Sequence, residues 1–119
     1  MDTVAFLAPL LSALRQGIPM VVRKQRPSGD YLEGVLAHHD LARCCELLRG
    51  TLGEPAKEFG KDAKLDRAVQ KAIGAIGGIR TEQCLFLAQP EPQRMVYATL
   101  WPWASDPAQI TLKIGTLEL

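Results

Sequence analysis

The stretch MVYATLWPW, Met95 to Trp103, decides the fold because it is apolar on both sides of an extended strand. Successive side chains of a strand point to opposite faces. One face then carries Met95, Tyr97, Thr99, Trp101 and Trp103, and the other carries Val96, Ala98, Leu100 and Pro102. A strand of this kind must be covered on both sides. The stretch therefore predicts a strand that is covered on both faces, and it raises the question of what covers each face.

The rest of the C-terminal third is typical of further strands. CLFLA, Cys84 to Ala88, is a short apolar run, and QPEPQ, residues 89–93, breaks it before the strand Met95–Trp103. After the turn ASDPAQ, the run from Ile110 to Leu119 alternates apolar side chains with Thr111 and Lys113. This alternation predicts a strand with one buried face.

The N-terminal third predicts a helix followed by a hairpin. Four leucines at helical spacing indicate a helix over about Ala8–Gln16, with Pro9 in its first turn and Gly17 as its stop. The β-branched run Ile18–Gln25 and the run Tyr31–Ala37 flank RPSGD, residues 26–30, which has the composition of a turn.

Two further helices are predicted in the middle of the chain. Asp40 before and Gly50 after the run Leu41–Arg49 are typical of a helix cap and a helix stop. A second apolar stripe, which Asp62 can cap, ends at Gly77 and Gly78. Its members are Leu65, Ala68, Val69, Ala72, Ile73 and Ile76.

These elements predict one α+β domain over residues 1–119, with the order α-β-β-α-α-β-β-β. We expect two layers, namely a largely antiparallel sheet with the helices on one face. Helices on one face leave the aromatic face of the strand Met95–Trp103 uncovered. Aromatic residues and methionine are enriched at interface cores. We therefore expect a second molecule to cover Met95, Tyr97, Trp101 and Trp103, most simply in a homodimer. The alternatives are that a terminus or loop of the chain folds over this face, or that a bulge before Pro102 changes the register.

The octapeptide HHDLARCC, His38 to Cys45, is the closest approach to a chemical signature. A metal site would use His38, His39, Cys44 and Cys45, but adjacent residues point in different directions and do not converge easily. A thiol enzyme would use His39, Asp40 and Cys44, but the carboxylate of Asp40 disfavours a thiolate. The simpler interpretation is that two histidines end a strand, one facing in and one facing out, and that Cys45 is a small core residue.

Charge and composition limit the partners. The formal net charge of +1 argues against a dedicated nucleic-acid binder. The cluster Arg23, Lys24 and Arg26 at the hairpin tip is a candidate anion contact, although such a tip is commonly just solvated. We predict no cofactor. No run reaches the length of a membrane span, and three cysteines, two of them adjacent, are typical of reduced thiols in the cytoplasm.

The sequence favours a non-enzymatic assembly module that associates with itself. A different protein is a possible further partner. The alternative is a thiol- or metal-dependent enzyme centred on His39, Asp40 and Cys44. A small-molecule pocket between helices and sheet is a third possibility that sequence alone leaves open.

Overall fold

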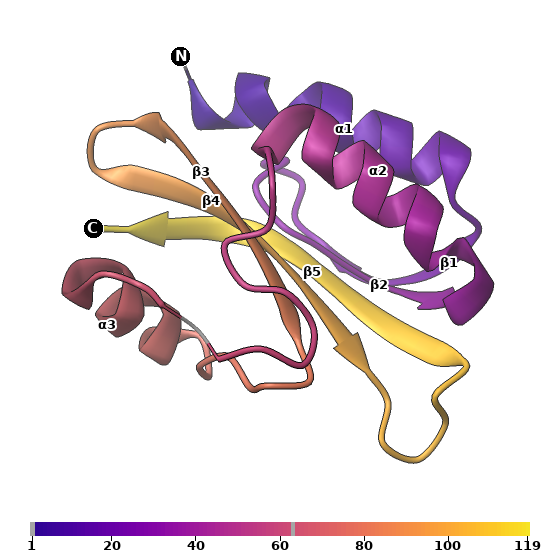
Figure 1. Cartoon of the computed structure of the whole chain (residues 1–119). Helices are drawn as coiled ribbons and strands as arrows, with labels where there is room; N and C mark the ends of the chain where they lie inside the picture. Colours follow the sequence, from indigo (N-terminus) through magenta and orange to yellow (C-terminus); the bar gives the residue numbers. More distant parts are fainter. Residues whose placement is uncertain (1, 63) are drawn as a thin grey trace.

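Five antiparallel strands form one sheet in the order β1-β2-β5-β4-β3. The computed structural model describes residues 2–62 and 64–119 of the chain (Figure 1). The elements in chain order are α1 (Thr3–Gly17), β1 (Met20–Gln25), β2 (Leu32–Ala37), the 3₁₀ turn η1 (His38–Asp40), α2 (Leu41–Leu52), α3 (Arg67–Ala75), β3 (Cys84–Glu91), β4 (Arg94–Pro102) and β5 (Gln109–Glu118). The predicted α+β class, element order and antiparallel pairing are confirmed.

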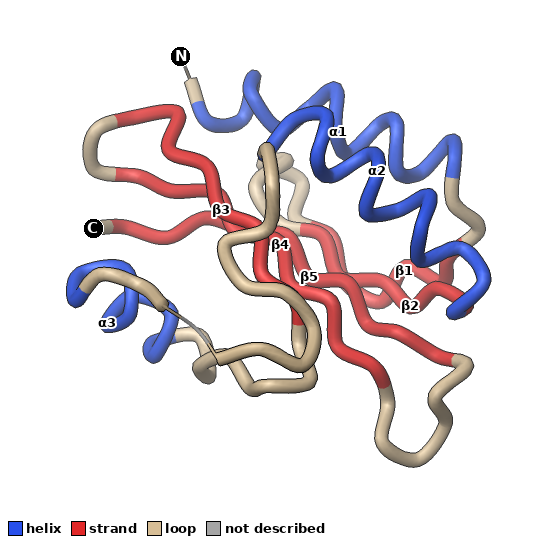
Figure 2. Tube along the Cα trace, in the orientation of Figure 1, coloured by secondary structure: helices blue, strands red, loops and turns tan. Residues whose placement is uncertain are grey.

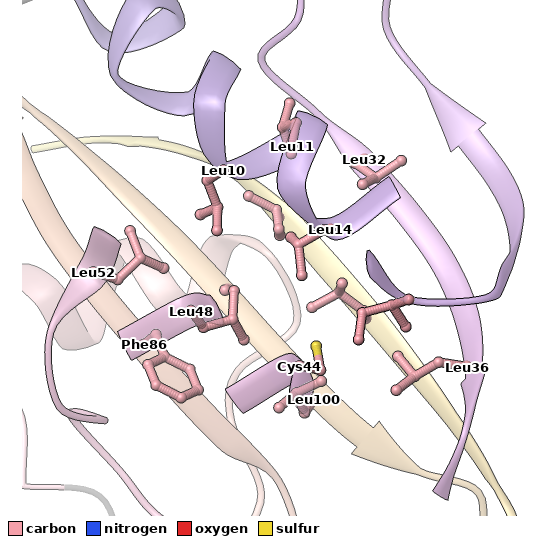
Figure 3. Packing of buried hydrophobic residues seen from close by; sticks show 14 of the residues in the cluster. Leu10, Leu11, Leu14, Leu32, Leu36, Cys44, Leu48, Leu52, Phe86 and Leu100 are labelled. Carbon is pink, nitrogen blue, oxygen red and sulfur yellow. The ribbon is translucent and has the colours of Figure 1, made fainter. Parts of the chain in front are cut away.

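Helices α1 and α2 lie side by side over one face of the sheet, which we call the inner face (Figure 2). The main core lies between this helix pair and the strands, and Figure 3 shows its leucines meeting Phe86 and Leu100. Val96, Ala98 and Leu100 of β4 point into it and are fully buried. Each large apolar side chain that is buried in this way contributes about 1.5–3 kcal/mol to folding.

Helix α3 lies on the opposite face, which we call the outer face (Figure 1). Its Val69 and Ile73 pack in a second cluster with Met95 and Tyr97 of β4. The prediction that all helices share one face is therefore corrected at α3. Because α3 is short and packs a single apolar stripe against the sheet, it covers only the end of β4 near Met95.

Helix α1 begins at Thr3, five residues before the predicted start at Ala8, and Pro9 lies inside it. Asp2 caps this helix, since its side chain accepts from the backbone N–H of Val4 at 3.4 Å. The Glu91 carboxylate, at the end of β3, accepts from the Thr3 backbone and hydroxyl. These contacts stabilise a first turn at Thr3. The sequence prediction had placed the first turn at Ala8, because proline is tolerated in a first turn.

Helix α2 runs three residues beyond the predicted end at Arg49, through Gly50 to Leu52. Gly53 ends it instead, with φ at +83°, a value that only glycine adopts without strain. Asp40 precedes the helix but its side chain makes no capping hydrogen bond. The buried stripe of α2 consists of Cys44, Leu48 and Leu52, so Cys44 rather than Cys45 is the small core residue.

The cap of α3 is Asp66, not Asp62, because Asp66 Oδ1 accepts from the backbone N–H of Val69 at 2.9 Å. The predicted end at Gly77 and Gly78 is confirmed, since both have positive φ just after the helix. Strand β3 continues through the predicted break to Glu91, with a register irregularity between Ala88 and Glu91 that accommodates Pro90.

The segment between α2 and α3 closes the free edge of β3. Leu85 exchanges backbone hydrogen bonds with this segment, accepting from Ala56 and donating to Lys57. Lys57 is a buried residue, and its ammonium donates to the backbone carbonyls of Glu58, Thr81 and Gln83. Lys57 thus holds the segment and the turn before β3 together.

We expect Lys57→Met to lower the free energy of unfolding by about 2–4 kcal/mol, because three carbonyls lose a charged donor. Urea unfolding measures the change. The matched control is Lys61→Met, whose ammonium is 3.1 Å from Glu58 on the surface and whose side chain is 70% exposed. The control should cost less than about 1 kcal/mol, as exposed ion pairs do. Equal losses in the two variants would contradict the clamp.

Candidate functional site

The outer face is divided into a covered half and an open half. Met95 and Tyr97 are 8% and 5% exposed beneath α3. The reason for expecting a second molecule over these two residues therefore falls away, because the chain itself supplies their cover. The open half carries the other end of β4 together with the neighbouring parts of β5, β2 and β1.

Cations, rather than a helix, lie over the two tryptophans of the open half. The Lys113 Nζ atom is 4.2 Å from the centroid of the Trp101 ring, and the Arg23 guanidinium is 5.7 Å from that of Trp103. The Trp103 indole N–H also donates to the Thr111 hydroxyl at 2.8 Å. Both indoles are half-buried within the chain. The predicted tryptophan interface therefore stays a prediction, with less apolar surface to bury than the sequence suggested.

The predicted basic tip reaches the same open half. Lys24 Nζ and the Arg26 guanidinium lie 5.9 Å and 5.2 Å from the centroid of the Tyr31 ring. Lys24, Arg26 and Lys113 line one hollow of about 260 Å³. Its aromatic walls are Tyr31, Tyr97 and Trp101. We call this hollow the cationic pocket. Arg23, the third predicted tip cation, is not in its lining and lies over Trp103 instead.

The floor of the cationic pocket depends on a glycine. Tyr97 pairs directly with Gly115 across β4 and β5. A Cβ atom at Gly115 would lie 2.6 Å from the Tyr97 hydroxyl oxygen and 2.8 Å from the ring, closer than atoms approach in proteins. The Tyr97 ring therefore rests on the bare backbone of β5. Ile76, just after α3, supplies an apolar side of the same hollow.

The phenols add no negative charge to this pocket at neutral pH. Burial, together with the hydrogen bond that its hydroxyl donates to Glu33 at 2.9 Å, raises the pKa of Tyr31. Burial also raises the pKa of Tyr97. Glu33 is the nearby carboxylate, 3.9 Å from the Lys113 ammonium, and it is not in the lining. The pocket is therefore net positive.

Two buried polar atoms at the cationic pocket have no hydrogen-bond partner within residues 2–62 and 64–119. They are the Thr99 hydroxyl oxygen and the Trp101 indole nitrogen. Both residues line the hollow, and Thr99 is only 2% exposed. An unpartnered buried polar group costs about 1–3 kcal/mol, so such groups are rare in folded proteins. Two residues that line this one hollow therefore carry buried polar atoms without a hydrogen-bond partner among the described residues.

The octapeptide His38–Cys45 does not form a site of the kind that its composition suggests. His38 and His39 form a 3₁₀ turn in which both are exposed. The prediction that one of them faces inward is therefore wrong. Within the described chain, no three His, Cys, Asp or Glu side chains come together as metal ligands would, including the candidate set His38, His39, Cys44 and Cys45. His39 contacts Asp40, with 3.4 Å between Nε2 and Oδ2.

The pKa values of the thiols are shifted upward, whereas those of nucleophilic thiols are shifted downward. Burial, assisted by the neighbouring Cys45, raises the pKa of Cys44 to about 12. Burial raises the pKa of Cys84 to about 11 and also raises the pKa of Cys45. A catalytic thiol instead has a depressed pKa. The three unpaired cysteines are therefore protonated at neutral pH and act as packing residues.

Sequence reasoning missed Tyr31, Thr99 and Lys113 as members of a site. Thr99 was expected on the aromatic face and Lys113 on the exposed face of its strand. No local signal places them together, because it is the register of β5 against β2 and β4 that sets Lys113 beside Glu33 and Thr99. The cluster of tip cations beside Tyr31 was the one visible sign.

The chain matches no protein-family model, no curated protein and no solved structure with which it was compared. Among its described helices, none is both long enough and apolar enough to cross a bilayer. The geometry of the outer face and of the sheet edges therefore carries the functional proposals alone.

We expect Thr99→Val to raise the free energy of unfolding by about 1 kcal/mol, since it replaces an unpartnered hydroxyl with a methyl group of similar size. The matched control is Thr111→Val on the same face. Its hydroxyl accepts from Trp103, and its loss should cost about 1 kcal/mol. Chemical unfolding of the two variants measures the difference, and a destabilised Thr99→Val protein would contradict the assignment.

We expect stability to fall in alkali because of the buried thiols. The pKa values of Cys44 and Cys84 are raised in the folded protein to about 12 and 11, whereas unfolded thiols ionise near pH 8.5. The folded state thus holds protons that the unfolded state releases. The free energy of unfolding should decrease above about pH 8.5, by at most about 1.4 kcal/mol per pH unit for each thiol.

Urea unfolding of the wild type and of Cys44→Ala between neutral and alkaline pH tests this, because the variant should show the shallower pH slope. Rapid reaction of Cys44 with a thiol reagent at neutral pH in the folded protein would contradict the raised pKa.

Proposed function

We propose that the protein is a non-enzymatic assembly module that pairs with a second copy of itself through the free edge of β1. The two edges of the sheet differ. The edge of β3 is occupied by the segment that includes Ala56 and Lys57. Strand β1 pairs with β2 on one side only. Its other row of backbone N–H and C=O groups is open, and an open edge is a template for another strand.

Exposed apolar side chains support this edge as the contact. Val21 is 68% exposed and Val22 is 40% exposed, and both belong to β1. Within residues 2–62 and 64–119, the other large apolar residue of comparable exposure is Leu119 near the C-terminal end. Two adjacent exposed valines on an edge strand, one on each face of the sheet, are the observation that carries the proposal, because a strand added at this edge would cover part of both side chains.

The basic residues of β1 select the register. Two antiparallel copies that are related by a two-fold axis at Val21 place the Val21 side chains opposite each other. Met20 then lies opposite Val22, and the cations Arg23 and Lys24 of the two copies lie at opposite ends. A pairing that is centred on Arg23 would set like charges side by side, which is destabilising. The register irregularity between Val22 and Lys24 also limits pairing to the first half of β1.

This proposal keeps the predicted homodimer and moves its contact from the tryptophan face to the strand edge. Trp103 remains connected to this edge, since Arg23 of β1 lies over its ring. Edge pairing alone buries less than a standard interface of about 1,200 Å². We therefore expect association in the micromolar range.

The alternative, a thiol- or metal-dependent enzyme centred on His39, Asp40 and Cys44, lacks such support. Cys44 is fully buried, whereas His38 and His39, which precede it in the sequence, are exposed. We also keep the cytoplasm as the proposed location, because the cysteines of the described chain are unpaired.

We expect Val21→Lys to abolish association, because the two-fold axis would bring two ammonium groups together. Sedimentation velocity over a range of concentrations measures the dimer fraction. The matched control is Leu119→Lys, which adds the same charge at another exposed apolar residue and should leave the dimer intact. A wild type that is monomeric at high micromolar concentration would remove the proposal.

A further inference from the structure

The three cations of the cationic pocket lie over aromatic rings, which do not offset their positive charge. Lys113 lies over Trp101, and Lys24 and Arg26 lie over Tyr31, at ring distances of 4.2, 5.9 and 5.2 Å respectively. A ring face attracts a cation but carries no net charge. A carboxylate in the same place would cancel the charge. The rings therefore position the cations and leave them available to an anion.

The carboxylates near these cations are poorly placed to neutralise them. The closest approach of Asp30 to Arg26 is 4.0 Å, and that of Glu33 to Lys113 is 3.9 Å, both at the outer limit of an ion pair. Glu33 already accepts the Tyr31 hydroxyl at 2.9 Å. Within the described residues, Lys24 has no ion-pair partner. Three cations are thus set against two weakly engaged carboxylates.

The remaining walls suit a flat apolar body. Tyr97, Trp101 and Ile76 line the hollow with two rings and one aliphatic side chain. Drug-sized ligands occupy pockets of about 300–1,000 Å³, so a hollow of about 260 Å³ fits a body of one or two rings. Thr99, a residue that is 2% exposed, also belongs to the lining, and its buried hydroxyl has no hydrogen-bond partner among the described residues.

We propose that the cationic pocket binds a small aromatic phosphate, with the phosphate among Lys24, Arg26 and Lys113 and the rings against Tyr97 and Trp101. Phosphate carries up to two negative charges at neutral pH and accepts bidentate hydrogen bonds from arginine. An aromatic carboxylate shares this chemistry with half the charge and binds more weakly. The pocket faces out of the sheet plane, so its occupancy does not depend on pairing at the edge of β1.

Nuclear magnetic resonance tests this directly, because Trp101 and Trp103 are the two tryptophans of the chain. Their indole N–H signals report on the pocket wall and on its surroundings separately. The probe is 2-naphthyl phosphate, and the comparison compounds are 2-naphthoate, 2-naphthol and inorganic phosphate. We expect the probe to shift the Trp101 signal and to bind at least about tenfold more tightly than 2-naphthol or inorganic phosphate, with 2-naphthoate in between.

Variants locate the phosphate. Arg26→Gln and Lys113→Gln should each weaken the probe about tenfold, the effect of one lost charge-assisted contact. The matched control, Arg15→Gln, removes an exposed cation from α1 on the other side of the sheet and should bind as the wild type does. Where a pocket variant fails to give a folded spectrum, the wild type is titrated at rising salt, and the dissociation constant of the probe should increase.

Four results would overturn the proposal. Inorganic phosphate that binds as well as the probe would make the site a simple anion patch, and 2-naphthol that binds as well would make it a simple apolar hollow. Equal weakening by Arg15→Gln would place the phosphate elsewhere. Binding of a thymidine oligonucleotide without binding of the probe would assign the surface to single-stranded nucleic acid.

Discussion

Strand β4 controls this structure because both of its faces must be removed from water. Its inner face lies under α1 and α2, where Leu100 and Ala98 are fully buried. Its outer face is shared between two kinds of cover. At the Met95 end the cover is α3, and at the Trp101 end the Lys113 side chain lies over the indole ring. A helix buries apolar surface completely, whereas here the charged group of Lys113 lies over the face of the Trp101 ring. The second kind of cover leaves a wet, charged surface.

The local pattern was sufficient to predict the elements and their order, but not the side of the sheet on which each helix packs. The apolar stripe through Val69 and Ile73 predicts a helix and states nothing about which face it covers. That choice follows from the path of the segment after α2, which is pinned to the edge of β3 by Lys57. Similarly, Gly50 and Gly53 are equally good stops by composition, and packing of Leu52 against the core carries the helix past the first. Such choices depend on contacts between distant residues.

For the same reason, only part of the candidate site could be predicted from the sequence. Arg23, Lys24 and Arg26 are neighbours in sequence and could be recognised together, and the two tryptophans could be placed on one face. Lys113 lies far from both groups along the chain. It joins them because β5 is inserted between β2 and β4, so that it faces Glu33 on one side and Thr99 on the other. The strand order of the sheet is thus what assembles the pocket, and no spacing in the sequence encodes it.

The allocation of Glu33 decides whether the assembled cations can act on an anion. Had Glu33 formed a close pair with Lys113, these two charges would offset each other and only Lys24 and Arg26 would remain as uncompensated cations of the lining. In the structure, Glu33 Oε1 accepts from the Tyr31 hydroxyl at 2.9 Å and lies 3.9 Å from the Lys113 Nζ atom, so its closer contact is with the phenol. The raised pKa of Tyr31 keeps the donated proton on the phenol at neutral pH. Tyr31 thereby occupies the carboxylate on one side while its ring face supports Lys24 and Arg26. A single aromatic residue at the end of the hairpin turn sustains the positive character of the pocket in two ways.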